Sequence, residues 1–281
     1  MLQLKFINLK IAHHSFLLWV LAILITLGSA IYQRLTGPTY PQRGKIAIGE
    51  SLIKFRLLRS ETVTQDAVIR LAVPDTSISG YVRYKRYKSS DDWSIVPLYR
   101  DGEKLIGMLP QQPAAGKLMY FVYLKSDGQE MSLTGDQPVI LRYKGAVPKS
   151  ILLPHVLLMF LAMLLSNRTL FESFDAQGRS YRFMLWTIGL FFLGGIVLGP
   201  LVQKYAFGAY WTGLPFGIDL TDNKTLIAFI GWLWAWFQNR RGRDGRFWIF
   251  IAAIIMLAIY LIPHSLLGSE LDYTKMAAPV E

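Results

Sequence analysis

Apolar residues form long runs near both ends of the chain, whereas the middle alternates between apolar and polar positions. A helix of about 20 mostly apolar residues, rising 1.5 Å per residue, spans the hydrocarbon core of a membrane. Five segments approach this length, and we expect each of them to be a membrane-spanning helix. They are residues 15–32, 150–166, 183–201, 222–238 and 247–262.

The positions of glycine and proline predict where the later segments end and how they pack. The third segment is predicted to end at Gly199-Pro200, because proline lacks the N–H group that continues a helix. The fifth is predicted to stop at Pro263 for the same reason. Gly195 and Gly199 form a GxxxG pattern, strengthened by Gly194, and this pattern predicts close packing against a neighbouring helix.

The middle of the chain, residues 38–147, has short runs of period-two alternation separated by turn signals, which is typical of β-strands. Asp101-Gly102 and Asp127-Gly128 are favourable hairpin turns. Seven short antiparallel strands in this length predict a sandwich of two sheets. The predicted strands are residues 51–58, 67–73, 81–87, 93–99, 104–108, 118–124 and 139–143.

A resemblance supports the sandwich. The residues that carry it are the run 80–87 (GYVRYKRY), Trp93, Pro97-Leu98, Asp101-Gly102, Leu109-Pro110 and the run 116–122 (GKLMYFV). Over about fifty residues this pattern resembles bacterial immunoglobulin or fibronectin type III-like domains. The resemblance implies a module that binds partners or acts as a spacer, without the inter-sheet disulfide of antibody domains because the chain has no cysteine.

The charges of the short loops predict the orientation in the membrane. With the N-terminus in the cytoplasm, nine Lys and Arg residues lie in cytoplasmic pieces: Lys5, Lys10, Arg168, Arg179, Arg182, Arg240, Arg241, Arg243 and Arg246. Three lie in the opposite short pieces: Lys204, Lys224 and Lys275. Short loops rich in Lys and Arg stay in the cytoplasm. We therefore expect a bacterial inner-membrane protein whose residues 33–149 and C-terminus are extracytoplasmic.

The expected organisation has four parts. Residues 1–32 form a transmembrane anchor, residues 33–149 an extracytoplasmic β-sandwich, residues 150–264 a four-helix transmembrane bundle, and residues 265–281 an extracytoplasmic tail. The fold class is thus an α-helical membrane bundle of about five helices plus an all-β immunoglobulin-like domain. Lys5, Lys10, an apolar core and Gly28-Ser29-Ala30 also fit a signal peptide cleaved after Ala30, which would leave four helices.

Composition limits the possible functions. The net charge of +11 does not favour nucleic-acid binding. Residues 33–149 carry 18 basic and 11 acidic residues spread among apolar positions, as on a solvated sheet face, and much of the remaining excess is in the short loops. The absence of cysteine excludes disulfides, thiolate metal sites, iron–sulfur clusters and thiol catalysis.

Aromatic residues of the middle domain are a candidate binding face. Tyr81, Tyr84, Tyr87 and Trp93 lie in or beside predicted strands. Strand aromatics favour core and cross-strand packing over ligand binding, and packing is our expectation for these four.

The segment 203–224 joins the third and fourth predicted spans and is rich in aromatic residues and helix breakers. Thr221 or Asp222 is predicted to cap the fourth helix, where an acidic group suits the positive helix end. The aromatic side chains suit a membrane–water boundary, so a loop packed on the bundle is the first interpretation.

A second interpretation comes from a partial likeness. Gly208-Ala209-Tyr210-Trp211-Thr212 and Asp219 resemble the tryptophan-rich loop of haem-handling proteins in c-type cytochrome assembly. That resemblance implies haem held against Trp211, with His155 and His264 as axial ligands. Each histidine also has a simpler interpretation as a hydrogen-bonding residue at a helix end.

The sequence shows no nucleophile–base pair, metal cluster or phosphate loop, so we favour a protein that is not an enzyme. Our first expectation is an inner-membrane scaffold or accessory subunit in contact with lipid and with membrane or periplasmic protein partners. The alternative is a haem-binding protein of cytochrome assembly or electron transfer. The expected interaction residues are Tyr210, Trp211, Phe216, Asp219 and Asp222.

Overall fold

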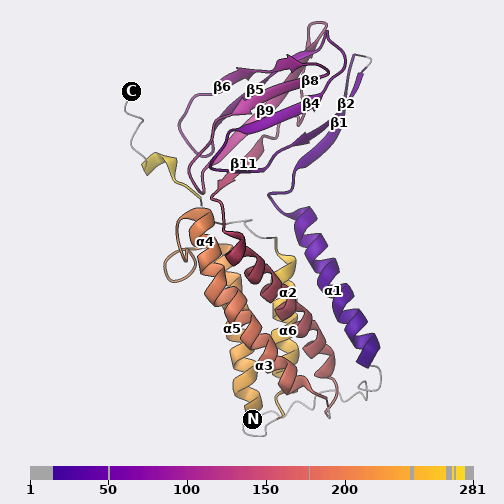
Figure 1. The fold of residues 1–281 in the computed structure, drawn as a ribbon, viewed down its shortest axis with the longest axis vertical. Helices are drawn as coiled ribbons and strands as arrows, with labels where there is room; N and C mark the ends of the chain where they lie inside the picture. The colour runs from indigo at the N-terminus through magenta and orange to yellow at the C-terminus, as the bar shows by residue number, and fades with distance from the viewer. Residues whose placement is uncertain are drawn as a thin grey trace. The chain divides into compact units, whose positions relative to one another are not determined.

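The computed structural model describes residues 15–49, 51–176, 178–240, 244–263, 268 and 270–275. These residues form helices and open β-sheets (Figure 1). The chain divides into two compact units. Unit 1 contains the described residues of Met1–Gly37, Val147–Tyr205 and Ala209–Gly268, and unit 2 those of Pro38–Ala146, Ala206–Gly208 and Ser269–Glu281.

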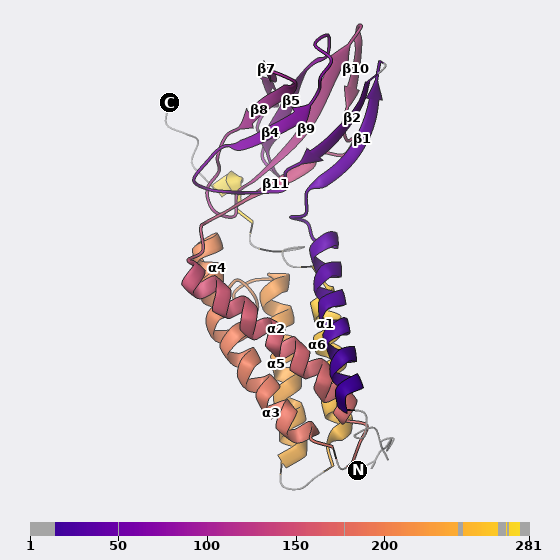
Figure 2. The same ribbon diagram turned by 45° about the vertical axis from the view of Figure 1, so that its right-hand side comes forward.

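Unit 1 is helical. Helix α2 packs against α1, α3, η2 and α6, and α5 packs against α3 and α6 (Figures 1 and 2). The elements are α1 (Ser15–Thr36), α2 (Lys149–Glu172), α3 (Ser180–Phe191), the π-helical segment η2 (Phe192–Leu198), α4 (Gly199–Phe207), α5 (Leu220–Asn239) and α6 (Arg246–Leu261).

Three helical stretches of the described chain are long and apolar enough to cross a membrane. They are Ser15–Thr36, Lys149–Glu172 and Ser180–Phe207, which combines α3, η2 and α4. Helix α6 is apolar but has only 16 residues.

Two predicted helix ends are wrong. Helix α2 continues six residues beyond position 166 and ends at Glu172, so Arg168 lies in the helix and not in a loop. The third segment continues through Pro200 to Phe207. In η2 the hydrogen-bond pattern has already shifted, since the N–H of Gly199 donates to the carbonyl of Gly194. Pro200 therefore falls in the first turn of α4, where its missing N–H is tolerated.

The interior of unit 1 is built from alanines and a few large side chains. Ala162, Ala228 and Ala252 are buried and allow the helices to approach closely. The indole of Trp232 is fully buried, and its Nε1–H donates to Met256 Sδ over 3.0 Å. Trp234, two residues later, is on a different side of α5 and is exposed.

Unit 2 holds the β-strands. The six-stranded sheet has the order β3-β11-β9-β5-β6, with β10 also paired to β9, and β4-β8-β7 and β1-β2 form two smaller sheets. Among the described strands, only β3 and β11 pair in parallel. The strands are β1 (Gln42–Ile48), β2 (Ser51–Leu57), β3 (Ser60–Thr62), β4 (Ala67–Ala72), β5 (Ser79–Arg86), β6 (Ser94–Pro97), β7 (Tyr99–Asp101), β8 (Lys104–Leu109), β9 (Lys117–Ser126), β10 (Gln129–Ser132) and β11 (Val139–Lys144).

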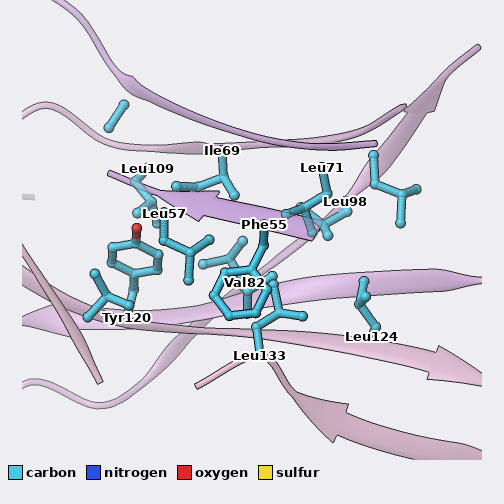
Figure 3. Close-up of a cluster of buried hydrophobic side chains, with 14 of the residues drawn as sticks. Phe55, Leu57, Ile69, Leu71, Val82, Leu98, Leu109, Tyr120, Leu124 and Leu133 are labelled. Atoms are coloured by element: carbon cyan, nitrogen blue, oxygen red, sulfur yellow. The ribbon is translucent and has the colours of Figure 1, made fainter. Parts of the chain in front are cut away.

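One hydrophobic core joins these sheets into two layers. Alternate residues of β9, from Leu118 to Leu124, point inward and are buried, as period two requires. They meet Leu57 and Ile69 from the smaller sheets (Figure 3). The hydroxyl of Tyr120 donates to the carbonyl of Leu58 over 2.8 Å, so its polar atom is satisfied at the edge of the core.

The seven predicted strands are confirmed in position, although 93–99 is divided between β6 and β7. Both predicted turns join hairpins, and Gly102, Asp127 and Gly128 have the positive φ values that such turns require. Strands β1, β3 and β10 were not predicted. The alternation of β1 is interrupted by Gly44, where a Cβ atom would clash with the ring of Phe55.

The C-terminal segment Glu270–Lys275 packs on the sandwich of unit 2. The N–H of Leu271 donates to the carbonyl of Ala115 over 3.1 Å. The buried hydroxyl of Tyr273 accepts from the N–H of Lys117 at 3.0 Å and donates to Gln112 Oε1 at 3.1 Å. The sequence analysis assigned this segment to an extracytoplasmic C-terminal tail and named no contact for it.

Candidate functional site

The candidate site of unit 1 is the aromatic loop before α5, residues 209–219. A buried carboxylate closes it. Asp222 Oδ2 accepts hydrogen bonds from the N–H of Thr212 (2.6 Å), the N–H of Gly213 (2.9 Å) and Gln203 Nε2 (3.0 Å). These three hydrogen bonds tie the loop and Gln203 to the start of α5.

Asp219, and not Thr221 or Asp222 as predicted, is the N-cap of α5. Its Oδ1 accepts from the N–H groups of Thr221 (2.8 Å) and Asp222 (3.4 Å). Its Oδ2 accepts from the hydroxyl of Thr212 over 3.2 Å. Both aspartates are buried, so they shape the loop from within.

The aromatic side chains of the loop are distributed over its surface. The indole Nε1–H of Trp211 donates to the carbonyl of Leu214 over 3.0 Å. The ammonium group of Lys204 lies 5.3 Å from the ring centre of Tyr210. Phe216 and Ile218 are 83% and 88% exposed, and Tyr210 and Leu214 are exposed as well. A loop tied from inside by hydrogen bonds thus displays a patch of apolar side chains.

His155 projects from α2 toward η2. Its Nδ1 lies 2.9 Å from the carbonyl oxygen of Gly194, and a carbonyl only accepts, so Nδ1 carries the proton. This tautomer leaves the lone pair of Nε2 uncommitted, which is the arrangement of a metal-ligating imidazole. His264, the second predicted ligand, lies outside the described residues. Across the described ranges, no group of three or more His, Asp or Glu residues is arranged to hold a metal ion.

The two glycines of the GxxxG pattern differ in their surroundings. A Cβ on Gly195 would approach Thr225 Cγ2 on α5 to 3.2 Å, whereas one on Gly199 would meet nothing closer than 3.7 Å. Gly194 is the tightest against α2, at 3.0 Å from Leu158 Cβ.

A buried polar cluster at the C-terminal end of α2 was missed by the sequence analysis. Arg168 Nη2 lies 2.5 Å from Glu172 Oε1, and both side chains are almost fully buried. The guanidinium lies 5.5 Å from the ring centre of Trp19 and 5.3 Å from that of Phe183. The i, i+4 spacing of Arg168 and Glu172, with apolar residues continuing to Phe171, is the signal that predicts this pair.

In unit 2 the packing expectation holds for Tyr84, which contacts the core. It also holds for Tyr81, which stacks across the strands on Tyr123, whereas Tyr87 and Trp93 make cation–π contacts outside that core. No catalytic arrangement was predicted for this domain. Its aromatic and basic side chains make the stacking and cation–π contacts described above.

The comparisons with known proteins add no assignment to this geometry. No protein-family model matches the chain, and no curated protein matches its sequence significantly.

Proposed function

We propose that this protein is a non-catalytic scaffold or accessory subunit of a bacterial inner membrane, which docks a larger assembly through its extracytoplasmic face. In this proposal α1, α2, the stretch from α3 to α4, α5 and α6 are five spans. Helix α6 is about 24 Å long at 1.5 Å per residue, and modest bilayer thinning accommodates a helix of that length.

The orientation is inferred from the basic residues along the sequence. Without Arg168, which lies in α2, eight remain in the pieces assigned to the cytoplasm, against three in the opposite pieces. This orientation places unit 2 and the aromatic loop outside the cytoplasm. Residues 33–149 are omitted from that comparison, because long domains cross the membrane regardless of their charge.

The observation that carries the docking proposal is the construction of the aromatic loop. Leu214, Phe216 and Ile218 are exposed on a backbone that Asp222 holds from inside. Rigid apolar groups suit binding, because little conformational entropy is lost when a partner covers them. The competing interpretation is that lipid at the membrane boundary covers these same side chains.

Site-specific photo-crosslinking in the native membrane separates a protein partner from lipid. A photoreactive phenylalanine analogue at position 216 or 218 should give a discrete adduct with one protein. The same analogue at Leu153, a comparably exposed residue of α2, should give lipid adducts only. Lipid adducts alone at positions 216 and 218 would reject docking through the loop.

One structural feature supports the alternative function of haem binding, namely the tautomer of His155. The bond to Gly194 leaves Nε2 available as an axial ligand. The visible spectrum of the detergent-purified protein tests this function. A Soret band that disappears in His155→Ala would support haem binding, and a colourless protein after growth with added haem would reject it.

A further inference from the structure

The outward face of the six-stranded sheet in unit 2 carries a continuous row of aromatic and basic side chains. On β9 the outward residues are Lys117, Met119, Phe121, Tyr123 and Lys125, which alternate with the buried core residues. On β5, Lys85, Arg83 and Tyr81 are paired with Met119, Phe121 and Tyr123. Paired residues point to the same side, so these two columns form one surface.

At one end of this row, a carboxylate of the same chain is bound to the basic and aromatic surface. The ammonium groups of Lys88 and Lys117 lie 5.3 and 5.4 Å from the ring centre of Tyr87. Between them they hold the carboxylate of Glu270, with Oε1 at 3.0 Å from Lys88 Nζ and Oε2 at 2.6 Å from Lys117 Nζ. Two cations beside one aromatic ring thus form a carboxylate site, and Glu270 of the C-terminal segment fills it.

The same arrangement recurs farther along the row at Trp93. The guanidinium carbon of Arg83 lies 4.7 Å from the ring centre of Trp93, and Lys85 Nζ lies 5.4 Å from it. Across the described part of the chain, neither cation has an ion pair with an acidic side chain. We propose that Arg83, Lys85 and Trp93 form a second carboxylate site, which binds an extended acidic segment of a partner polypeptide.

The surrounding surface favours a polypeptide over a phosphate polymer. Ile95 on β6 is paired with Arg83 and is 62% exposed, and the Phe121 ring lies 5.6 Å from that of Trp93. These apolar groups match the side chains of a peptide and have no counterpart in a phosphate chain. Strand β6 is the end of the sheet order, where an extended segment can be added.

The rings are poorly placed for stacking on sugars or nucleobases. Tyr81 and Tyr123 stack on each other with centres 5.0 Å apart, and the Trp93 ring has Arg83 over it. The edges of aromatic rings carry partial positive charge, so both the rings and the cations beside them suit a negatively charged ligand. Arg83 and Lys85 are two positions apart on β5 and face the same side, so both cations reach the ring of Trp93 and can hold one carboxylate between them, as Lys88 and Lys117 hold Glu270. In an extended ligand, acidic residues at every second position keep their carboxylates on the side that faces this site.

The test uses the full chain in nanodiscs of phosphatidylcholine and a rhodamine-labelled peptide in which Glu alternates with Tyr, Val and Thr. Fluorescence anisotropy should show saturable binding, and a matched peptide with Gln in place of Glu should not bind. Arg83→Gln with Lys85→Gln should weaken binding at least about tenfold. The control is Lys45→Gln with Lys54→Gln, which removes the same charge from an exposed pair on β1 and β2 and should change affinity less than about twofold.

Equal weakening by the two double variants would overturn the proposal, because it would show attraction by net charge alone. The proposal would also be overturned if the Arg83 and Lys85 changes weakened binding to phosphatidylglycerol nanodiscs or polyphosphate but did not weaken binding of the peptide. A swapped variant, Arg83→Lys with Lys85→Arg, keeps both charges and should bind within about threefold of the wild type. Its complete loss of binding would also contradict a charge-based site.

The role of this peptide site in the cell rests on the proposed docking function, whereas binding of the peptide does not. The peptide assay tests the surface around Arg83, whereas crosslinking at Phe216 tests the aromatic loop, so either proposal can fail alone.

Discussion

The Nδ1 atom of His155 lies 2.9 Å from the carbonyl oxygen of Gly194, and this hydrogen bond joins α2 to the π-helical segment η2. The same carbonyl accepts from the N–H of Gly199, five residues later in the chain. The contact requires the two backbones to approach closely, which the missing side chain of Gly194 permits.

Gly194→Ala should therefore destabilise unit 1. The added Cβ would lie 3.0 Å from Leu158 Cβ and 3.2 Å from the backbone nitrogen of Met159, which cannot move aside freely. Overpacking of this kind costs about 2 kcal/mol. Thermal unfolding in detergent measures the effect. Gly189→Ala is the control, since nothing lies within 4 Å of its new Cβ, and an equal loss there would contradict the packing argument.

Asp222→Ala should loosen the aromatic loop. It leaves the N–H groups of Thr212 and Gly213 without their acceptor, at a cost of about 3 kcal/mol. Hydrogen exchange of residues 209–218 should become faster. Phe216→Ala, which removes an exposed side chain and none of these bonds, should leave exchange unchanged. Equal protection in Asp222→Ala and the wild type would show that the carboxylate does not order the loop.

Glu172→Gln tests the buried ion pair. The change leaves the Arg168 charge uncompensated in a buried place and should cost about 3 kcal/mol in the free energy of unfolding. Adding Arg168→Met should restore most of the stability, because methionine packs well on the rings of Trp19 and Phe183. A double variant as unstable as the single one would show that the pair itself, and not the unpaired charge, matters.

Docking of the C-terminal segment should depend on pH. Burial raises the pKa of Glu270, but hydrogen bonds from Lys117 and Lys88 outweigh it and hold that pKa below its ordinary value. A lowered carboxyl pKa stabilises the docked state above the ordinary pKa, and this contribution is lost as pH falls below about 4. Protection of the Leu271 amide, corrected for intrinsic exchange, should fall over that range.

Glu270→Gln provides the matched control for this pH dependence. Its Leu271 protection should already be about tenfold lower at neutral pH, because two ion pairs are lost. It should then change little on acidification. A wild-type pH profile that persists in Glu270→Gln would assign the effect to another group.

Local pattern was sufficient for most secondary structure. The apolar runs located the helices, and period two located seven strands, because both signals depend only on which face of an element is buried. The wrong helix ends have the same origin. Arg168 was assigned to a loop by its charge, but it lies in α2, where it pairs with Glu172 and contacts two aromatic rings.

The candidate sites depended on contacts between distant segments. Nothing near Arg83 in the chain indicates that its partner ring is Trp93, and nothing near Lys117 indicates that Glu270 returns to it across 153 positions. Asp219 was singled out through the resemblance to a haem-handling loop and Asp222 as a possible helix cap, but only the folded loop shows that both carboxylates face inward.

The sequence by itself thus determined which segments form apolar helices and which alternate as strands, since hydropathy and period are local properties. The tertiary structure decided which charges are paired, which glycines are crowded and which aromatic rings are exposed. Those properties arise from side chains brought together by folding, and no local pattern encodes the neighbours that a side chain meets.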